Sequence, residues 1–222
     1  MIKAVIFDMY ETLITLWASK PYFRREMVED MGVSVEAMSP YWDETEEGRS
    51  IGEYTFEEAV AMMLKKLNIY SDELLKKMSK SRHDAKAEAF NHIHPGIIPM
   101  LEEIHQRGYK IGLVSNCFSE ESELIKESLL YKYFDAAMLS FDEGLSKPDE
   151  RIFLRCLERL DLKPEECLYV GDGGCDELKV SGKLGMHPLQ AVWYLYDNSG
   201  QPCKRMAEYE HLENPEDIFK YL

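Results

Sequence analysis

Five short runs of β-branched and aliphatic residues recur along the chain, and their wide spacing constrains the fold more than any other feature. The runs cover residues 4–7, 110–115, 136–140, 167–171 and 190–194. Helical patterns with one apolar stripe separate the later runs, at residues 95–107, 119–130, 149–160 and 176–184. Short apolar strands that alternate with helices form parallel βαβ units. We therefore predict an α/β fold with a Rossmann-like parallel sheet as its core.

The segment from residue 15 to residue 92 breaks this alternation. It contains no convincing strand and carries helical patterns at residues 21–31, 55–67 and 71–89. Thr55 and Glu58 have the spacing of a capping box, in which each side chain binds the backbone of the other at the start of a helix. We predict an α/β core made of residues 1–14 and 93–222, with a helical domain of residues 15–92 inserted after the first strand.

Charge and cysteine content limit the partners that we expect. The 222 residues include 26 Lys and Arg against 41 Asp and Glu, which gives a formal net charge of −15. An acidic surface repels polyanions, so we expect neither nucleic acid nor an anionic membrane surface as a partner. No apolar run approaches the roughly 18 residues needed to cross a bilayer, and nothing indicates an oligomeric state. The 5 cysteines are odd in number and form no C-x-x-C pair, which favours a reduced, cytoplasmic location.

Polar residues follow four of the expected strands, at the edge where parallel sheets bind their ligands. They are Asp8 after the first strand, Ser115 and Asn116 after the second, Lys147 after the third, and Asp172 and Asp176 after the fourth. Each of these residues alone has an ordinary alternative as a turn residue, a helix cap or a surface charge. Their occurrence at successive strand ends favours one shared site.

The chemistry of these side chains suits a phosphate and a divalent cation. Carboxylates at Asp8, Asp172 and Asp176 would repel one another, and Mg²⁺ relieves such repulsion while it binds waters and a substrate phosphate. Ser115 and the amides after it can donate to an anion, and Lys147 can balance its charge. Asp8 is then placed to attack as a nucleophile and form an aspartyl-phosphate. We predict a small phosphorylated molecule as the substrate and Mg²⁺ as the cofactor.

These residues resemble the four motifs of the haloacid dehalogenase superfamily of hydrolases, in the family's order and across the whole chain. The matching stretches are Val5–Leu13, Ile111–Asn116, Gly144–Pro148 and Gly171–Asp176. For the metal, the resemblance implies the Asp8 carboxylate, the Tyr10 carbonyl and Asp172 as ligands, with Asp176 orienting a metal-bound water or Lys147. For the phosphate, it implies Ser115, Asn116 and Lys147, with Thr12 supporting the loop at Asp8. The inserted helices resemble the family's α-helical cap, which closes over the substrate and selects it.

One position departs from the phosphatases of that family. The residue two after the nucleophile is usually an aspartate that acts as general acid and then as base, and here it is Tyr10. A phenol with a pKa near about 10 can donate a proton but is a poor base at neutral pH. Loss of a positioned acid–base group typically costs about 10²- to 10⁴-fold in rate. Glu11 and Glu177 are carboxylates nearby in the sequence, but neither stands at the family's acid position.

Two alternative functions depend on Tyr10. The 2-haloacid dehalogenases of the same superfamily resemble this chain at that position, and they use the same aspartate to displace halide without a metal. Asp172 argues against this alternative, because a second carboxylate beside Asp8 without a cation would raise repulsion and weaken the nucleophile. The other alternative is a regulatory or phosphate-binding module that accepts phosphate on Asp8 and loses it slowly. Between these functions we favour the Mg²⁺-dependent phosphatase.

Overall fold

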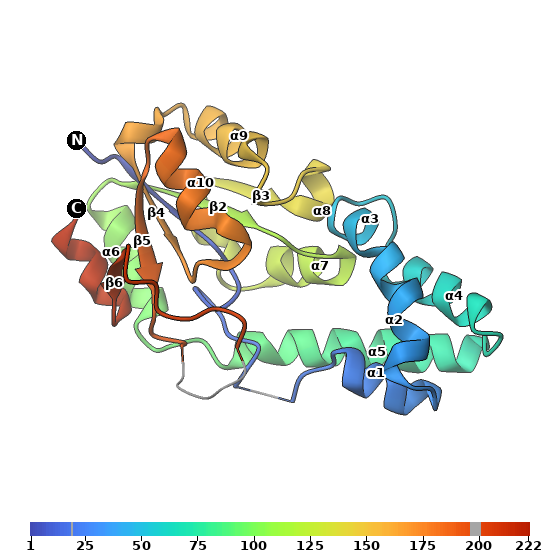
Figure 1. Cartoon of the computed structure of the whole chain (residues 1–222). Helices are drawn as coiled ribbons and strands as arrows, with labels where there is room; N and C mark the ends of the chain where they lie inside the picture. The colour runs from blue at the N-terminus through green and yellow to red at the C-terminus, as the bar shows by residue number, and fades with distance from the viewer. Residues whose placement is uncertain (19, 196–200) are drawn as a thin grey trace.

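One parallel sheet of six strands forms the centre of the larger lobe (Figure 1). The computed structural model describes residues 1–18, 20–195 and 201–222. The strands are β1 (Ala4–Phe7), β2 (Lys110–Ser115), β3 (Ala136–Leu139), β4 (Cys167–Gly171), β5 (His187–Ala191) and β6 (Glu210–Leu212). Their order across the sheet is β3-β2-β1-β4-β5-β6, and each neighbouring pair is parallel. This arrangement confirms the predicted α/β fold with a Rossmann-like sheet.

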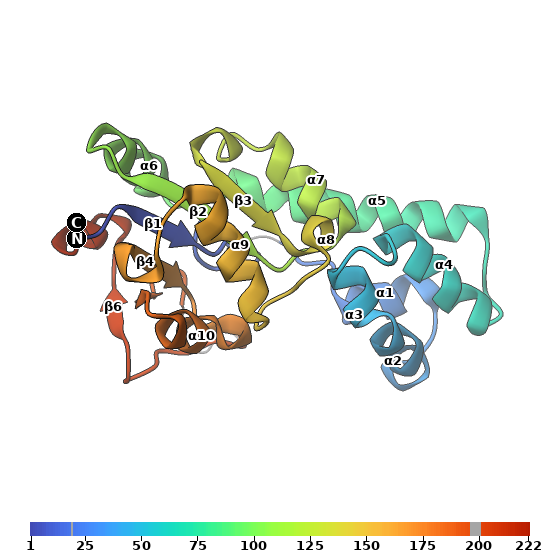
Figure 2. The same cartoon turned by 90° about the horizontal axis from the view of Figure 1, so that it is seen from above.

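Helices cover both faces of the sheet (Figures 1 and 2). One face carries α6 (Ile97–Gln106), α7 (Ser119–Glu127) and the 3₁₀ helix η5 (Pro215–Lys220), and the other carries α9 (Glu150–Leu160) and α10 (Glu177–Leu184). Alternation along β1 explains the two layers, since successive side chains of a strand point to opposite faces. Val5 and Phe7 pack into the apolar core beneath α6, whereas Ala4 and Ile6 pack into the core beneath α9. Short helical turns complete this lobe: η2 (Tyr131–Tyr133), α8 (Ser140–Glu143), η3 (Pro164–Glu166) and η4 (Gly174–Asp176).

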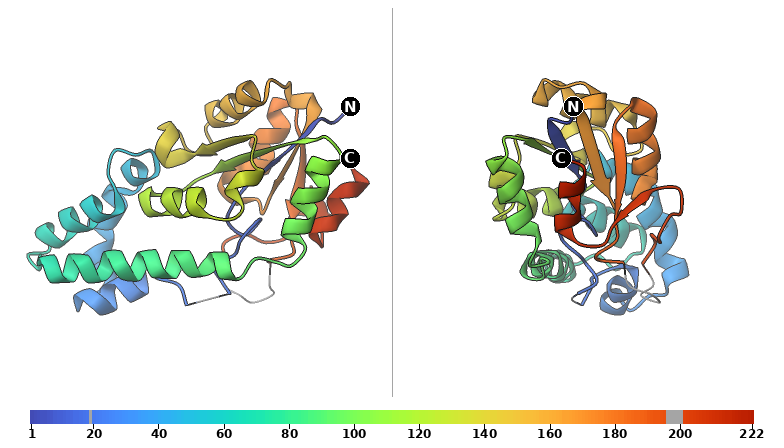
Figure 3. Two further views of the ribbon diagram at one scale, coloured as in Figure 1. Left: turned by 180° about the vertical axis from the view of Figure 1, so that it is seen from behind. Right: turned by 90° about the vertical axis from the view of Figure 1, so that its left-hand side faces the viewer.

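A lobe of helices extends from the carboxyl ends of the strands (Figure 2). It contains α1 (Arg24–Met31), α2 (Val35–Glu44), α3 (Glu46–Ser50), α4 (Phe56–Lys66) and α5 (Asp72–Glu88), followed by the 3₁₀ turn η1 (Ala89–Asn91). Buried Met38, Met63, Leu64 and Met78 belong to a core that is separate from those of the sheet. The described residues between 15 and 92 contain no strand, while the exact domain boundaries stay a prediction. Both chain ends lie at the opposite end of the molecule (Figure 3).

Local signals fixed the start of α4 correctly. The Thr55 hydroxyl accepts a hydrogen bond from the Glu58 amide at 3.1 Å, and the Glu58 carboxylate accepts one from the Thr55 amide at 2.8 Å. These two bonds confirm the capping box.

In the described part of the chain, no helix is long and apolar enough to span a membrane.

The last predicted strand was misplaced, and a sixth strand was missed. The strand expected at 190–194 begins and ends three residues earlier, as β5, and β6 follows as a short edge strand. The apolar residues after β5 instead support the loop behind Asp8. Trp193 donates from its indole nitrogen to the Thr12 carbonyl at 2.8 Å, and the Tyr194 hydroxyl donates to the Leu13 carbonyl at 3.4 Å. Their apolar character therefore reflects burial against this loop and not a place in the sheet.

Candidate active site

Three buried carboxyl groups meet at the carboxyl edge of the sheet. Asp8 follows β1, Asp172 follows the neighbouring strand β4, and Glu177 opens α10. One oxygen of each lies within 4.8 Å of an oxygen of the other two, and all three residues are buried. This is the position where the strand order of a doubly wound sheet reverses and where such sheets bind ligands. The sequence correctly placed Asp8 and Asp172 side by side.

Lys147 balances part of this negative charge. Its ammonium lies 2.7 Å from a carboxylate oxygen of Asp8 and also pairs with Glu177. Burial opposes the charge of Lys147, but the two carboxylates outweigh burial and raise its pKa. Burial raises the pKa of Glu177 to about 8, and the charge of Asp8 adds to this effect. Burial and the neighbouring Asp172 likewise raise the pKa of Asp8, although Lys147 opposes them. Among the described residues, the three carboxyl groups outnumber the one ammonium that pairs with the cluster, so when ionised they carry an excess of negative charge that a divalent cation would offset.

Asp176 lies outside this cluster, contrary to the role expected for it. Its side chain is exposed, and its backbone is left-handed with φ 53°. Gly173 and Cys175, in the loop before it, also have a left-handed backbone. This left-handed turn continues through Asp176, so α10 begins only at the next residue. Glu177 consequently takes the inward position. Gly171 makes room for it, because a Cβ at that residue would lie 1.9 Å from a Glu177 carboxylate oxygen.

Ser115 and Asn116 lie beside the cluster but differ in what they contact. The Asn116 side chain accepts from the Lys147 amide at 2.7 Å and donates to the Lys147 carbonyl at 2.9 Å. Asn116 therefore fixes the backbone that carries the lysine. The Ser115 hydroxyl is buried and makes one long contact of 3.4 Å, to the Asn116 carbonyl. This bond is long, so the hydroxyl can turn its single donor to another acceptor.

The loop after Asp8 is held by buried side chains. Glu11 accepts hydrogen bonds from the Thr15 hydroxyl at 2.7 Å and from the Leu16 amide at 2.8 Å. Glu11 adopts a left-handed backbone with φ 57°. These bonds occupy the Glu11 carboxylate with loop structure and leave it poorly suited to replace the missing acid. Thr12 is fully buried, and its hydroxyl has no partner among the residues that the structure describes.

Tyr10 sits between the sheet and the helical lobe. Its hydroxyl is buried and has no hydrogen-bond partner within the described ranges. The ammonium of Lys86, from α5, lies 5.1 Å from the centre of the Tyr10 ring. Burial, followed by the charge of Glu121, raises the pKa of Tyr10 above its ordinary value. The phenol therefore stays protonated at neutral pH and holds its proton more tightly than in water, so almost no phenolate is present to act as a base.

Two cavities open at this edge of the sheet. The smaller, of about 260 Å³, is lined by Asp8, Lys147 and Asp172 among others. The larger, of about 640 Å³, lies against the helical lobe and is lined by Arg49, Arg82 and other residues. Both are lined by Tyr10, Leu16, Phe23, Asn116 and Cys175. The acidic cluster therefore adjoins a larger space walled by the lobe.

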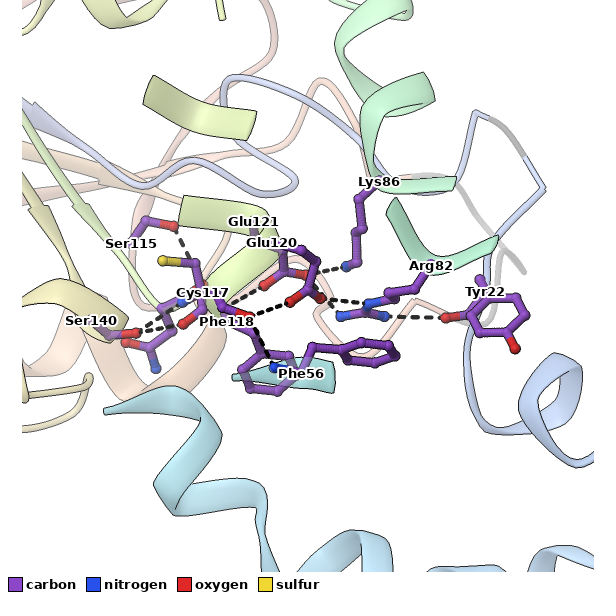
Figure 4. A network of polar contacts seen from close by, with 12 residues as sticks. Tyr22, Phe56, Arg82, Lys86, Ser115, Cys117, Phe118, Glu120, Glu121 and Ser140 are labelled. Atoms are coloured by element: carbon purple, nitrogen blue, oxygen red, sulfur yellow. Dashed lines mark hydrogen bonds and ion pairs between the residues drawn. The ribbon is translucent and has the colours of Figure 1, made fainter. Parts of the chain in front are cut away.

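A buried ionic network joins the two lobes beside the larger cavity (Figure 4). Arg82 of α5 pairs with Glu120 at 2.8 Å and with Glu121 at 3.0 Å, both from α7. Lys86, one turn further along α5, pairs with Glu121 at 2.5 Å. Burial alone would raise the pKa of Glu121, but the two cations hold it below its ordinary value. Sequence patterns did not indicate this network, since charged residues on helices usually face water.

Comparisons with known proteins agree with this geometry. The model of the haloacid dehalogenase-like hydrolases matches residues 2–177, and the chain belongs to this family of enzymes. A glyceraldehyde 3-phosphate phosphatase from Methanopyrus kandleri is 27% identical over 84% of this chain and 82% of its own. The structure of a 2-haloacid dehalogenase from Pseudomonas syringae pv. Tomato covers 99% of this chain and 97% of its own, with a TM-score of 0.71 and 20% identity. A Bacteroides thetaiotaomicron family enzyme, in complex with magnesium and inorganic phosphate, covers 90% and 96% with a TM-score of 0.61 and 18% identity. These two structural likenesses establish the fold.

Proposed function

We propose that this hydrolase is a Mg²⁺-dependent phosphatase that removes phosphate from a small phosphomonoester. The observation that carries the proposal is the cluster of Asp8, Asp172 and Glu177, whose carboxyl groups outnumber the single ammonium of Lys147. Mg²⁺ prefers such oxygen ligands and usually also binds a substrate phosphate. The relative from Methanopyrus kandleri, named a phosphatase, supports this chemistry.

In this proposal Asp8, Asp172 and the Tyr10 carbonyl hold the ion, with Glu177 in the place first expected for Asp176. Bound there, Mg²⁺ would offset the repulsion between the carboxylates and the incoming phosphate. Lys147, at 2.7 Å from Asp8, favours the ionised form of that carboxylate and adds positive charge. The Ser115 hydroxyl donates to a phosphate oxygen.

The reaction then proceeds in two displacements. A carboxylate oxygen of Asp8 forms a bond to phosphorus while the bond from phosphorus to the leaving alcohol breaks, which gives an aspartyl-phosphate. Tyr10 supplies the proton that the leaving alkoxide needs. A water then attacks phosphorus, the bond to Asp8 breaks, and phosphate leaves. Between the two displacements the Tyr10 phenolate regains a proton from solvent, so a neutral phenol, which is a poor base, faces the attacking water. The proton of that water must then leave to solvent, and we expect the second displacement to be slow.

The proposal is tested with purified protein, a panel of phosphorylated metabolites and Mg²⁺. We expect release of inorganic phosphate that depends on Mg²⁺ and disappears with EDTA. Asp8→Asn keeps the shape of the nucleophile and should abolish turnover. Absence of phosphate release from every member of the panel, together with chloride release from 2-chloropropionate, would reject the phosphatase.

A 2-haloacid dehalogenase is the second candidate, and the observation that favours it is Tyr10. Halide leaves without a proton, so the missing acid would carry no penalty. The buried Asp172 and Glu177 argue against it, since they repel the anionic form of Asp8 that must attack. The chloride assay above separates the two candidates directly.

A regulatory module is the third candidate, and it differs from an enzyme in the lifetime of its phosphorylated form. Tyr10 as a weak base favours slow loss of phosphate from Asp8. An aspartyl-phosphate that turns over in seconds supports an enzyme, whereas one that persists for hours supports a switch.

A further inference from the structure

The helical lobe contributes a buried arginine to the larger cavity. Arg49, on α3, is 1% exposed and lines that cavity. None of the ion pairs found within the described residues includes it. Nη1 donates to the Trp42 carbonyl at 2.7 Å and contacts the Thr45 hydroxyl, whereas Nε has no hydrogen-bond partner in the described part of the chain. A buried guanidinium with an unused donor is rare unless a ligand completes it.

Aromatic rings hold the guanidinium by its faces. Its central carbon lies 3.5 Å from the centre of the Trp42 ring and 5.0 Å from that of Phe118. Stacking offsets part of the cost of burying the charge. Stacking leaves the in-plane edge that carries Nε uncovered. Such an edge binds carboxylates through parallel hydrogen bonds. The rings therefore orient Arg49 but do not neutralise it.

The neighbouring buried cations already have partners. Arg82 and Lys86 face the two carboxylates of α7, so these four charges cancel. Burial lowers the pKa of Arg49 to about 10, and Glu46 opposes this effect. Glu46 is exposed, so water screens its charge. Among the buried charged groups described beside this cavity, Arg49 is the cation that lacks a counter-ion.

Arg49 and Asp8 line two cavities that adjoin each other. Tyr10 and Asn116 line both cavities. A molecule whose phosphate meets Asp8 and Lys147 in the smaller cavity, and that is longer than this cavity, extends past Tyr10 into the larger one. Its far end then approaches Arg49 between aromatic walls.

We propose that Arg49 binds a carboxylate at the far end of the substrate, so that the enzyme acts on phosphorylated carboxylic acids. This inference rests on the proposed phosphatase function and narrows its substrate class. Planar and bidentate, a carboxylate matches the free edge of the guanidinium. A phosphorylated alcohol of equal length would leave that edge unsatisfied and bind more weakly.

Two probes of similar size test the inference: 3-phosphoglycerate carries a carboxylate, whereas glycerol 3-phosphate carries an alcohol in its place. Calorimetric titration of the Asp8→Asn protein in Mg²⁺ measures binding without turnover, and phosphate release by the parent protein measures kcat/KM. We expect 3-phosphoglycerate to be preferred by about 10- to 100-fold in both measurements. In Arg49→Gln this preference should disappear because KM for 3-phosphoglycerate rises. The kcat/KM for glycerol 3-phosphate should change by less than about twofold.

The control is Arg107→Gln, which removes an exposed arginine paired with Glu103 on α6, and it should keep the preference. Arg49→Lys keeps the positive charge but not the planar pair of parallel donors, and it should retain only part of the preference for 3-phosphoglycerate. Equal affinity of the parent site for both probes overturns the inference whether or not Arg49→Gln folds, and so does an equal loss for both probes in a folded Arg49→Gln. Hydrolysis without preference leaves the phosphatase standing and rejects the carboxylate site. Binding of 3-phosphoglycerate that depends on Arg49, without hydrolysis of any phosphomonoester, supports the site and rejects the phosphatase.

Discussion

Tyr10 concentrates the unusual chemistry of this site in one residue. Its hydroxyl is buried and unpaired among the described residues, and burial raises its pKa. An unpaired buried hydroxyl costs free energy, so a substrate that accepts its proton recovers a hydrogen bond. Tyr10 can thus donate to the leaving group in the first displacement, but once protonated again it cannot act as the base in the second.

Replacement of Tyr10 by aspartate tests this division. In Tyr10→Asp a carboxylate would stand where it can donate a proton and then act as base, so we expect kcat to rise at least about tenfold. Tyr10→Phe removes the donor and should slow formation of the aspartyl-phosphate. Single-turnover kinetics with a chromogenic phosphomonoester separates the two steps. A kcat for Tyr10→Asp within twofold of the parent would show that proton transfer at this position does not limit turnover.

At the scale of elements, the contact between α5 and α7 joins the helical lobe to the sheet. Arg82 and Lys86 meet Glu121 with nearly all of their side chains buried. A desolvated network of this kind contributes little compared with apolar packing, but removal of one member leaves a buried charge unpaired. The contact is therefore sensitive to single substitutions.

Glu121→Gln should destabilise the protein by about 3–5 kcal/mol, because Lys86 loses its carboxylate and Arg82 loses one of two. Glu123→Gln, on the exposed side of α7, is the matched control and should change the free energy of unfolding by less than about 0.5 kcal/mol. Urea unfolding followed by circular dichroism measures both. Equal stability of the two variants would contradict a structural role for the network.

Which elements could be predicted follows from how they are buried. β1, β2 and β4 are covered on both faces and read as continuous apolar runs, so the sequence marks them clearly. β6 has three residues at an edge, and α2 contains Pro40, so neither has a strong pattern.

The order of site residues at strand ends was predictable for the same reason as the strands. The exchange of Asp176 for Glu177 was not, because it depends on the left-handed turn between Gly173 and Asp176.

For the molecule as a whole, the acidic cluster links folding to pH and to metal. The folded pKa of Glu177 is about 8, against about 4.3 in an unfolded chain. Between these values the folded protein holds a proton that the unfolded chain has lost, so stability falls as pH rises from about 5 to 8. The raised pKa of Asp8 acts in the same direction. Lys147 stays charged in the folded and the unfolded state over this pH range, so it contributes nothing to the pH dependence of stability.

Mg²⁺ competes with that proton, so its stabilising effect should grow with pH. At 100 times its Kd, an ion that binds the folded state adds about 2.7 kcal/mol, or about 5–10 °C in Tm for a chain of this size. We expect thermal unfolding in EDTA to show a lower Tm at pH 8 than at pH 6, and Mg²⁺ to raise Tm more at pH 8. Glu177→Gln should reduce the change of Tm with pH. Asp176→Asn should leave that change as it is, because the Asp176 side chain is exposed. An equal gain from Mg²⁺ at both pH values, or a slope unchanged in Glu177→Gln, would show that Glu177 does not couple the proton to the metal.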